Sequence, residues 1–281
     1  MVDIEAGFLA KYPQYRQWLD VDRVRQDMRD TLARATLATD PFPHLVVDDF
    51  FPRELYAMLN DAWPPLAAFR PNKSRQKLDV VPRDDPRDEM TGRFSELPAC
   101  LRELWDAVAH SINRHVVGPW LADMFRDFVR ERVALLDELR ADGRTGFSFP
   151  SPSRPLTTTG RLMMRGRGYV LRPHLDPAPH LVTALHYYAD VADAGQYGTA
   201  LFRAARPMPL DAFVRDGTTE YFHTQGIDVE RVAQIEFVPN RFLAFPNVLH
   251  AAHGVTAPAG DHYRRVFQFH VTVRPDTAAA Y

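Results

Sequence analysis

The pattern of apolar and polar residues changes about halfway along the chain. In the first half, apolar residues recur every three or four positions, as in helices with one buried face. In the second half, they occur in short runs of strand-like period, separated by residues that favour turns. The pattern therefore predicts a helical region followed by a β-rich core.

The first half is predicted to support that core. Residues 1–40 are expected to form an amphipathic helical extension, and residues 41–51 an apolar strand ending in an acidic turn. Pro52 stands where a helix would begin. Helices with an apolar stripe are predicted at 53–62, 97–117 and 121–140.

Long polar stretches interrupt this pattern. Residues 71–94 show no sustained period, which predicts a loop, and residues 142–160 favour turns. Residues 204–230 are interpreted as a long insertion between strands. The segments 73–94 and 204–230 could each be a lid over a functional site or a solvent-exposed surface loop.

Eight short strands are predicted after residue 160, and eight strands suit a double-stranded β-helix, a form of jelly roll. We therefore expect an α+β protein with a mainly β core, flanked by N-terminal helices. One domain is expected over 1–281, with an extension at 1–40, a strand and supporting helices at 41–150, and the jelly-roll core at 155–275. The predicted strands are 161–164, 168–171, 181–188, 199–202, 232–238, 241–245, 254–257 and 264–273.

Composition narrows the class of protein. The net charge of -2 and the pI near 6.6 indicate no general attraction to nucleic acid or anionic membranes. The single cysteine, Cys100, excludes an internal disulfide and a cysteine-based zinc cage, and it fits a reducing compartment. The first ten residues have acids where a signal peptide has bases, and no long uncharged apolar run follows. We expect a cytoplasmic protein with neither nucleic-acid nor membrane partners.

The candidate chemistry lies in two histidine-containing stretches. His174 and Asp176 are two residues apart near the end of a strand-like run, so they face the same side and could hold one ion. Alone, a His-x-Asp tripeptide is more often a histidine hydrogen-bonded to a carboxylate. About eighty residues later, the chain offers His250 and His253 as a third ligand. We favour His253, because His250 would require a much tighter turn after the strand at 241–245.

These residues, taken with Arg264, resemble the motif of the non-haem iron(II), 2-oxoglutarate-dependent oxygenases. That motif is His-x-Asp, a long gap, a histidine often followed by Gly-Val, and an arginine or lysine about ten residues later. His253 is followed by Gly-Val and Arg264 by a strand-like run. The resemblance covers roughly residues 41–275 and extends to the prolyl-hydroxylase-like and phytanoyl-type members of the family. It implies a cupin-like double-stranded β-helix. It also implies that iron(II) is held by His174, Asp176 and His253.

The resemblance also implies a cation for the distal carboxylate of 2-oxoglutarate. Arginine binds a carboxylate through two parallel hydrogen bonds, and only one of Arg264 and Arg265 can point inward on a strand. Arg264 shares its face with Val266, Gln268 and His270, the more polar set, so we favour it over Arg265. Tyr187 could add a hydroxyl to the same carboxylate, as in some relatives.

The implied activity is oxidation of an unactivated carbon, with iron(II), 2-oxoglutarate and dioxygen required and ascorbate as a candidate reductant. Hydroxylation or desaturation is expected, because halogenating members usually have a small residue where this chain has Asp176. A small metabolite, such as an amino acid or biosynthetic intermediate, is favoured as substrate because no peptide-binding module is appended. The alternatives are a prolyl-hydroxylase-like enzyme acting on a protein, a cupin-type metalloenzyme without 2-oxoglutarate, and a non-catalytic jelly roll. The oligomeric state is open.

Overall fold

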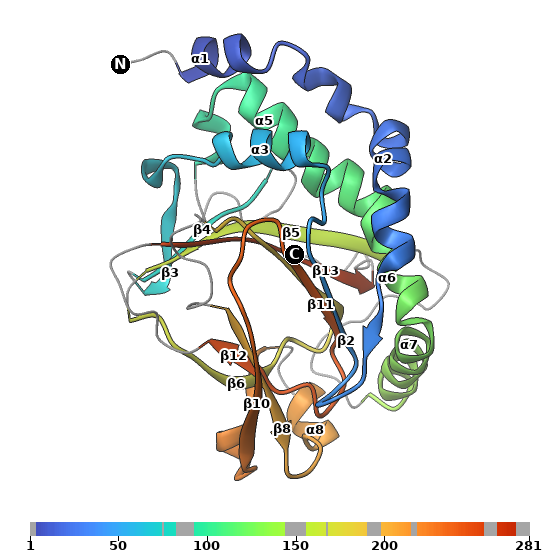
Figure 1. The fold of residues 1–281 in the computed structure, drawn as a ribbon. Helices are drawn as coiled ribbons and strands as arrows, with labels where there is room; N and C mark the ends of the chain where they lie inside the picture. The colour runs from blue at the N-terminus through green and yellow to red at the C-terminus, as the bar shows by residue number, and fades with distance from the viewer. Residues whose placement is uncertain are drawn as a thin grey trace.

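Two antiparallel sheets face each other in the computed structural model (Figure 1). The structure describes residues 4–74, 76–82, 93–143, 156–166, 168–189, 198–214, 218–255 and 263–273. The larger sheet contains, in spatial order, Leu37–Ala38 (β1), His44–Val47 (β2), Phe242–Pro246 (β11), His180–Tyr187 (β7), Arg264–Val273 (β13), Leu156–Arg165 (β5), Lys77–Val80 (β4) and Arg70–Ser74 (β3). The smaller sheet contains Val229–Ile235 (β10), Thr199–Ala204 (β8), His253–Val255 (β12), Leu171–Leu175 (β6) and Glu220–Tyr221 (β9).

The path of the chain between these sheets is that of a double-stranded β-helix. From β5 to β8 each strand lies in the sheet opposite to the preceding one, and β10 to β13 repeat the alternation. The eight strands of this double-stranded core are β11, β7, β13 and β5 in the larger sheet and β10, β8, β12 and β6 in the smaller sheet. The predicted jelly roll is confirmed.

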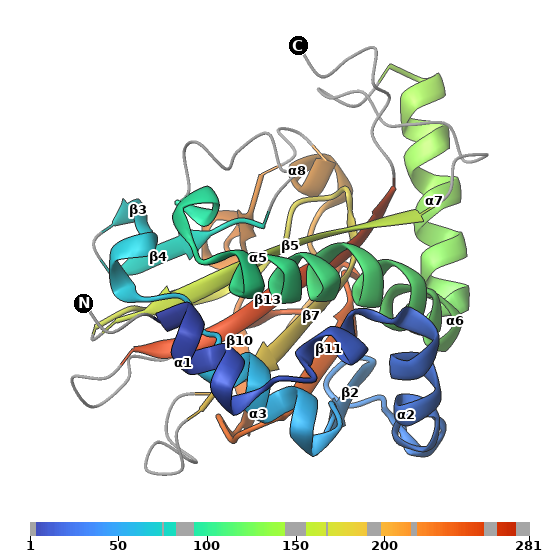
Figure 2. The same ribbon diagram turned by 90° about the horizontal axis from the view of Figure 1, so that it is seen from above.

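Helices cover the outer face of the larger sheet (Figures 1 and 2). The ring of Trp105 lies 5.8 Å from that of Phe267 on β13, and Phe50 stacks on Phe242 of β11 at 3.9 Å. No helix in the described residues is long and apolar enough to cross a bilayer. The helices are Ile4–Lys11 (α1), Tyr15–Leu19 (η1), Val21–Arg34 (α2), Arg53–Asp61 (α3), Leu66–Ala68 (η2), Phe94–Glu96 (η3), Ala99–Asp106 (α5), Ala107–Val117 (η4, a π-helix), Gly118–Met124 (α6), Arg126–Ala141 (α7), Leu210–Val214 (α8) and Phe222–Gln225 (η6).

Several predicted boundaries were wrong. Residues 71–94 were predicted as a loop, but β3 and β4 form a hairpin that extends the larger sheet. Its polar residues and Pro71 hide the strand pattern, and an outermost strand such as β3 tolerates both. The predicted strand 168–171 is mostly irregular, since Gly168 has a left-handed φ of 76° and the amide of Tyr169 donates to the carbonyl of Gly166, and β6 begins only at Leu171. Residues 83–92, part of the suggested lid, lie outside the described residues.

The insertion expected at 204–230 has structure of its own. It contains α8, β9 and η6, and β10 begins at Val229. The helix predicted at 97–117 continues as the π-helix η4, and the following helix divides at Phe125. A Cβ atom at Gly118 would lie 2.7 Å from the carbonyl oxygen of Asn113 and 2.8 Å from Thr158 Cγ2. Glycine is therefore needed where this helical segment meets β5.

Asn240 joins the N-terminal strand region to the core. It has a left-handed φ of 57°, its side-chain amide donates to the carbonyl of Phe51 at 2.8 Å, and its Oδ1 accepts from the Phe51 amide at 3.0 Å. Asn240→Ala should lower the free energy of unfolding by about 3 kcal/mol, because buried groups lose partners and alanine disfavours this φ. Denaturant unfolding would measure the loss. Asn240→Gly should cost less, since glycine accepts the backbone conformation, and equal losses would contradict this account.

His186 makes stability depend on pH. Burial lowers its pKa from 6.5 to about 3, while Nε2 lies 3.0 Å from Asn240 Oδ1 and Nδ1 lies 2.9 Å from the Tyr188 hydroxyl. The unfolded chain binds a proton below pH 6.5 and the folded chain does not, so stability falls as the pH falls. Between pH 7 and pH 5 this group should cost about 2 kcal/mol. Denaturant unfolding of His186→Gln at both pH values should show a pH dependence weaker by that amount, and an unchanged dependence would contradict it.

Candidate metal centre

Three metal-binding side chains meet between the sheets. His174 on β6 and His253 on β12 are partners in the smaller sheet, and Asp176 follows β6 directly. The Nε2 atoms of His174 and His253 lie 3.6 Å and 3.5 Å from the carboxylate oxygens of Asp176. One donor atom from each residue lies within 4.8 Å of the others, and all three residues are buried. The structure therefore brings together the three ligands expected from the sequence.

Backbone carbonyls orient both imidazoles. His174 Nδ1 lies 2.9 Å from the carbonyl oxygen of Arg172, and His253 Nδ1 lies 3.1 Å from that of Ala251. A carbonyl can only accept, so each Nδ1 carries a proton, and Nε2 is the nitrogen that faces Asp176 and is placed to bind a metal. This is the arrangement that a metal-ligating histidine requires.

The protonation states also suit a metal. Burial and the neighbouring His174 lower the pKa of His253 to about 4, so its imidazole is neutral at pH 7. Burial would raise the pKa of Asp176, but the neighbouring His253, His174 and His270 together hold it well below its usual value. Two imidazole nitrogens and one carboxylate form the set typical of non-haem iron(II) sites.

A second group shares Asp176 but is less suited to one ion. Asp176, His180 and His270 also offer donor atoms within 4.8 Å of one another. The rings of His180 and His270 stack at 3.7 Å and 15°, so their lone pairs lie in nearly parallel planes and do not converge. The rings of His174 and His253 are inclined by 47°, which allows convergence. His253 belongs to the group with His174 and Asp176. The half-buried His250, three residues earlier in the chain, belongs to neither group of the described residues.

Thr183 holds the carboxylate in place. Its buried hydroxyl, on β7, donates to Oδ2 of Asp176. Thr183→Val keeps the shape of the side chain and removes the donor, so it should weaken Mn(II) binding by about 10- to 100-fold. Isothermal titration would measure the affinity, and Thr183→Ser should stay within a few-fold of the natural protein. Equal weakening by both substitutions would indicate a packing effect instead.

Arg264 lies inside the barrel and is buried. Its Nη2 donates to Thr199 Oγ1 at 3.0 Å, and that hydroxyl lies 2.7 Å from the hydroxyl of Tyr187. Its Nε is buried without a hydrogen-bond partner, and no carboxylate of the described residues forms an ion pair with it. Burial lowers the pKa of Arg264. A buried guanidinium with an unfilled donor suits the carboxylate of a ligand.

Arg265 faces the other side of the sheet, as strand alternation predicts. Its Nη2 donates to Asn60 Oδ1 at 3.1 Å, and its guanidinium lies 5.8 Å from the ring centroid of Trp63. The structure thus places Arg264 inside the barrel, with Thr199 and Tyr187 beside it. Thr183 and Thr199 were not singled out from the sequence, because their contacts join segments far apart in the chain.

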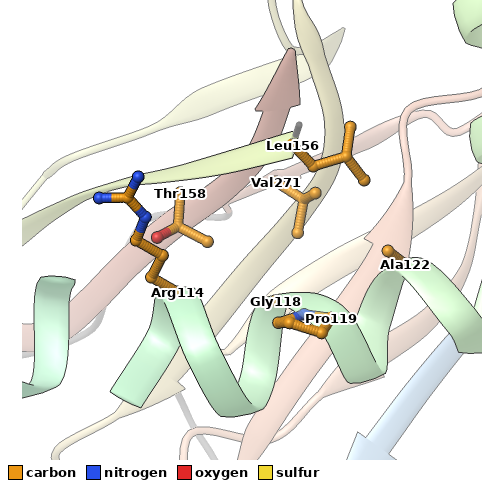
Figure 3. Close-up of a pocket in the computed structure, with 7 residues that line it drawn as sticks. All are labelled: Arg114, Gly118, Pro119, Ala122, Leu156, Thr158 and Val271. Carbon is orange, nitrogen blue, oxygen red and sulfur yellow. The ribbon is translucent and has the colours of Figure 1, made fainter. Parts of the chain in front are cut away.

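A cavity of about 310 Å³ lies on the outer face of the larger sheet (Figure 3). Thr158 of β5 and Val271 of β13 form one wall, and Gly118 and Pro119 of α6 form another. Val271 points away from the barrel interior, since its neighbour His270 faces Asp176. This cavity is therefore separated from the metal centre by the sheet.

Comparison with known proteins gives distant structural similarity. No protein-family model and no curated protein matches the sequence. A prolyl-4-hydroxylase of Pseudomonas putida is 15% identical with a TM-score of 0.37, covering 89% of this chain and 99% of that one. An oxidoreductase of the 2OG-Fe(II) oxygenase family from Burkholderia pseudomallei is 10% identical with a TM-score of 0.42, covering 91% of each chain. HygX from Streptomyces hygroscopicus, solved with nickel and 2-oxoglutarate, is 13% identical with a TM-score of 0.40, covering 82% of each chain.

The double-stranded β-helix and the buried His-Asp-His group agree with what the resemblance of the sequence to the Fe(II)/2-oxoglutarate oxygenases implies. The eight core strands, the His-x-Asp pair at the end of β6 and the histidine on β12 are the features that this resemblance led us to expect. At such low identities and TM-scores, the functional interpretation depends on this chain's own strand order and side chains.

Proposed function

We propose that the protein is an iron(II)- and 2-oxoglutarate-dependent oxygenase that hydroxylates or desaturates an unactivated carbon of a small metabolite. One observation supports this most strongly. A buried His-Asp-His donor set and a buried arginine with an unfilled donor face the interior of the same barrel. The donor set suits a divalent iron ion, and the arginine suits the distal carboxylate of an acid bound to that ion.

Each residue would have a distinct part in binding. His174, Asp176 and His253 would hold the ion from one side and leave its other positions open. Arg264 would bind the distal carboxylate of 2-oxoglutarate, with Thr199 fixing the guanidinium and the Tyr187 hydroxyl close by.

The cofactors would supply the oxidising chemistry. When bound, iron and 2-oxoglutarate couple reduction of dioxygen and decarboxylation of the cosubstrate to oxidation of a carbon–hydrogen bond. The protein would orient the reactants and exclude water, since the donor residues and Arg264 are all buried.

The alternatives account for fewer of these residues. A cupin-type metalloenzyme without 2-oxoglutarate would use the triad but would have no use for a buried Arg264. A non-catalytic jelly roll would explain neither the oriented imidazoles nor the arginine. A protein substrate instead of a small metabolite would leave the iron and 2-oxoglutarate chemistry unchanged.

Anaerobic spectroscopy distinguishes these possibilities. Iron(II) and 2-oxoglutarate are added to the protein without air, and the metal-to-ligand charge-transfer band of the chelate is recorded. Air and ascorbate are then admitted, and succinate is assayed. The band followed by succinate supports the proposal. Iron binding without any effect of 2-oxoglutarate would favour the cupin-type enzyme, and no iron binding would favour the non-catalytic protein.

A further inference from the structure

The inner wall of the larger sheet carries a second polar group beside the metal centre. On β13, Arg264 faces inward, and Gln268 lies four residues further along on the same face. Gln268 pairs with Arg161 of β5, so Arg161 also faces the interior. The ring of Phe267, on the opposite face, contacts Trp105 on the helical side, which agrees with this assignment.

Arg161 and Gln268 stand close to the proposed iron site. His270 Nε2 lies 3.9 Å from Asp176 Oδ2, and Gln268 precedes His270 by two residues, about 7 Å along the strand. β13 lies between β7 and β5. Arg264 contacts Tyr187 of β7 and Thr199 of β8, whereas Arg161 belongs to β5 on the other side. The two arginines therefore flank different sides of the interior.

The side chains of Arg161 and Gln268 are more exposed to solvent than those of the metal ligands and Arg264. The metal ligands and Arg264 are buried, while Gln268 is half-buried and the side chain of Arg161 is 19% exposed. Solvent therefore reaches the interior at Arg161 and Gln268. A substrate would enter by the same route as solvent, so this pair would be among the first polar groups that it meets.

Asp79 fixes the position of Arg161. Asp79, on β4, is fully buried, and its Oδ1 accepts from Arg165 Nη1 at 2.6 Å. Its Oδ2 lies 3.5 Å from Arg161 Nη1. The short contact thus goes to Arg165 and the longer one to Arg161. The guanidinium of Arg161 presents a planar fork of donors, the geometry that binds a carboxylate through two parallel hydrogen bonds, and Asp79 holds this side chain in place.

We propose that Arg161, positioned by Asp79 and assisted by the amide of Gln268, binds a carboxylate of the substrate beside the metal centre. This inference rests on the proposed function and narrows its substrate class to small organic acids, including amino acids. Arg161 would be a binding residue that sets specificity, and it would be separate from the Arg264 site for 2-oxoglutarate.

Fluorine relaxation can test this without knowledge of the substrate. Manganese(II) replaces iron in the full-length protein, 2-oxoglutarate is added to saturation, and trifluoroacetate serves as the carboxylate probe. Its ¹⁹F relaxation should be enhanced by the nearby manganese, while that of the neutral analogue trifluoroacetamide should not. Arg161→Gln should weaken trifluoroacetate binding by about 10- to 100-fold. Asp79 would keep Arg165 as its partner in this variant, so the fold should be retained.

Arg203→Gln is the matched control. It removes the same charge from an exposed arginine on β8 that pairs with Asp40, and it should leave the fluorine relaxation unchanged. Enhancement that survives Arg161→Gln, or equal effects of the two probes, would overturn the carboxylate site. Water-proton relaxation tests the proposed function separately, because manganese binding should raise it and 2-oxoglutarate should lower it by displacing bound water. Failure of that signal would reject the oxygenase proposal itself.

Discussion

Replacement of His253 by alanine is expected to abolish iron binding and, with it, oxidation of 2-oxoglutarate. His253 supplies one of three donor atoms, and its Nε2 is fixed toward Asp176 by the contact of Nδ1 with the carbonyl of Ala251. Loss of a direct ligand should exceed the 10- to 100-fold effect typical of residues that only support ligands. We therefore expect the affinity for Fe(II) or Mn(II) to fall by more than about 100-fold.

Anaerobic titration calorimetry with Mn(II) would measure this loss, and the charge-transfer band with iron and 2-oxoglutarate would report on the assembled site. His250→Ala is the matched control, since His250 is half-buried, lies three residues away and is outside the donor group. Metal affinity should be retained in that variant. A larger loss for His250→Ala than for His253→Ala would show that the third ligand is misassigned.

Replacement of Arg264 by glutamine is expected to weaken binding of 2-oxoglutarate while metal affinity is retained. The guanidinium is buried beside Thr199 and Tyr187, so a carboxylate bound there would be screened little by water. Removal of one partner of a buried charged pair costs about 2–5 kcal/mol, which corresponds to a loss of affinity of roughly 30-fold or more. The Mn(II) affinity should change by less than about threefold, because Arg264 offers no ligand atom to a cation.

Titration of the iron-loaded protein with 2-oxoglutarate would measure this affinity through the charge-transfer band. Arg265→Gln removes the same charge from the opposite face of β13, where Arg265 contacts Asn60 and Trp63. That control should bind 2-oxoglutarate with nearly unchanged affinity. If the two variants behave alike, the cation of the cosubstrate site lies elsewhere.

Local patterns were sufficient for much of the core, whereas the three candidate ligands were expected from the resemblance to the oxygenase motif. His174 and Asp176 could be identified because a strand repeats its facing every two residues and the pair sits beside a strand. The position of Arg264 inside the barrel followed from the same alternation along β13. Such features depend on neighbouring residues, so they can be read from the order of residues alone.

Other features depend on pairing between distant segments. Arg161 and Gln268 share a face only through the register of β5 with β13, which nothing near either residue specifies. The β3–β4 hairpin was missed because β3 is polar and contains Pro71, the apolar alternation of β4 is limited to Leu78 and Val80, and the hairpin is held in place by pairing with β5. The π-helix η4 was also missed, because an apolar helical stripe does not distinguish it from an ordinary α-helix.

The position of β13 between β5 and β7 has a consequence for synthesis on the ribosome. All three donor residues precede β13 in the chain, so they leave the ribosome before it. At that stage the position between β5 and β7 in the larger sheet is still empty. Unpaired strand edges of this kind invite association with other chains until the last strand inserts. The same insertion brings Arg264 into the barrel, so closure of the sheet and completion of the proposed cosubstrate site become a single event.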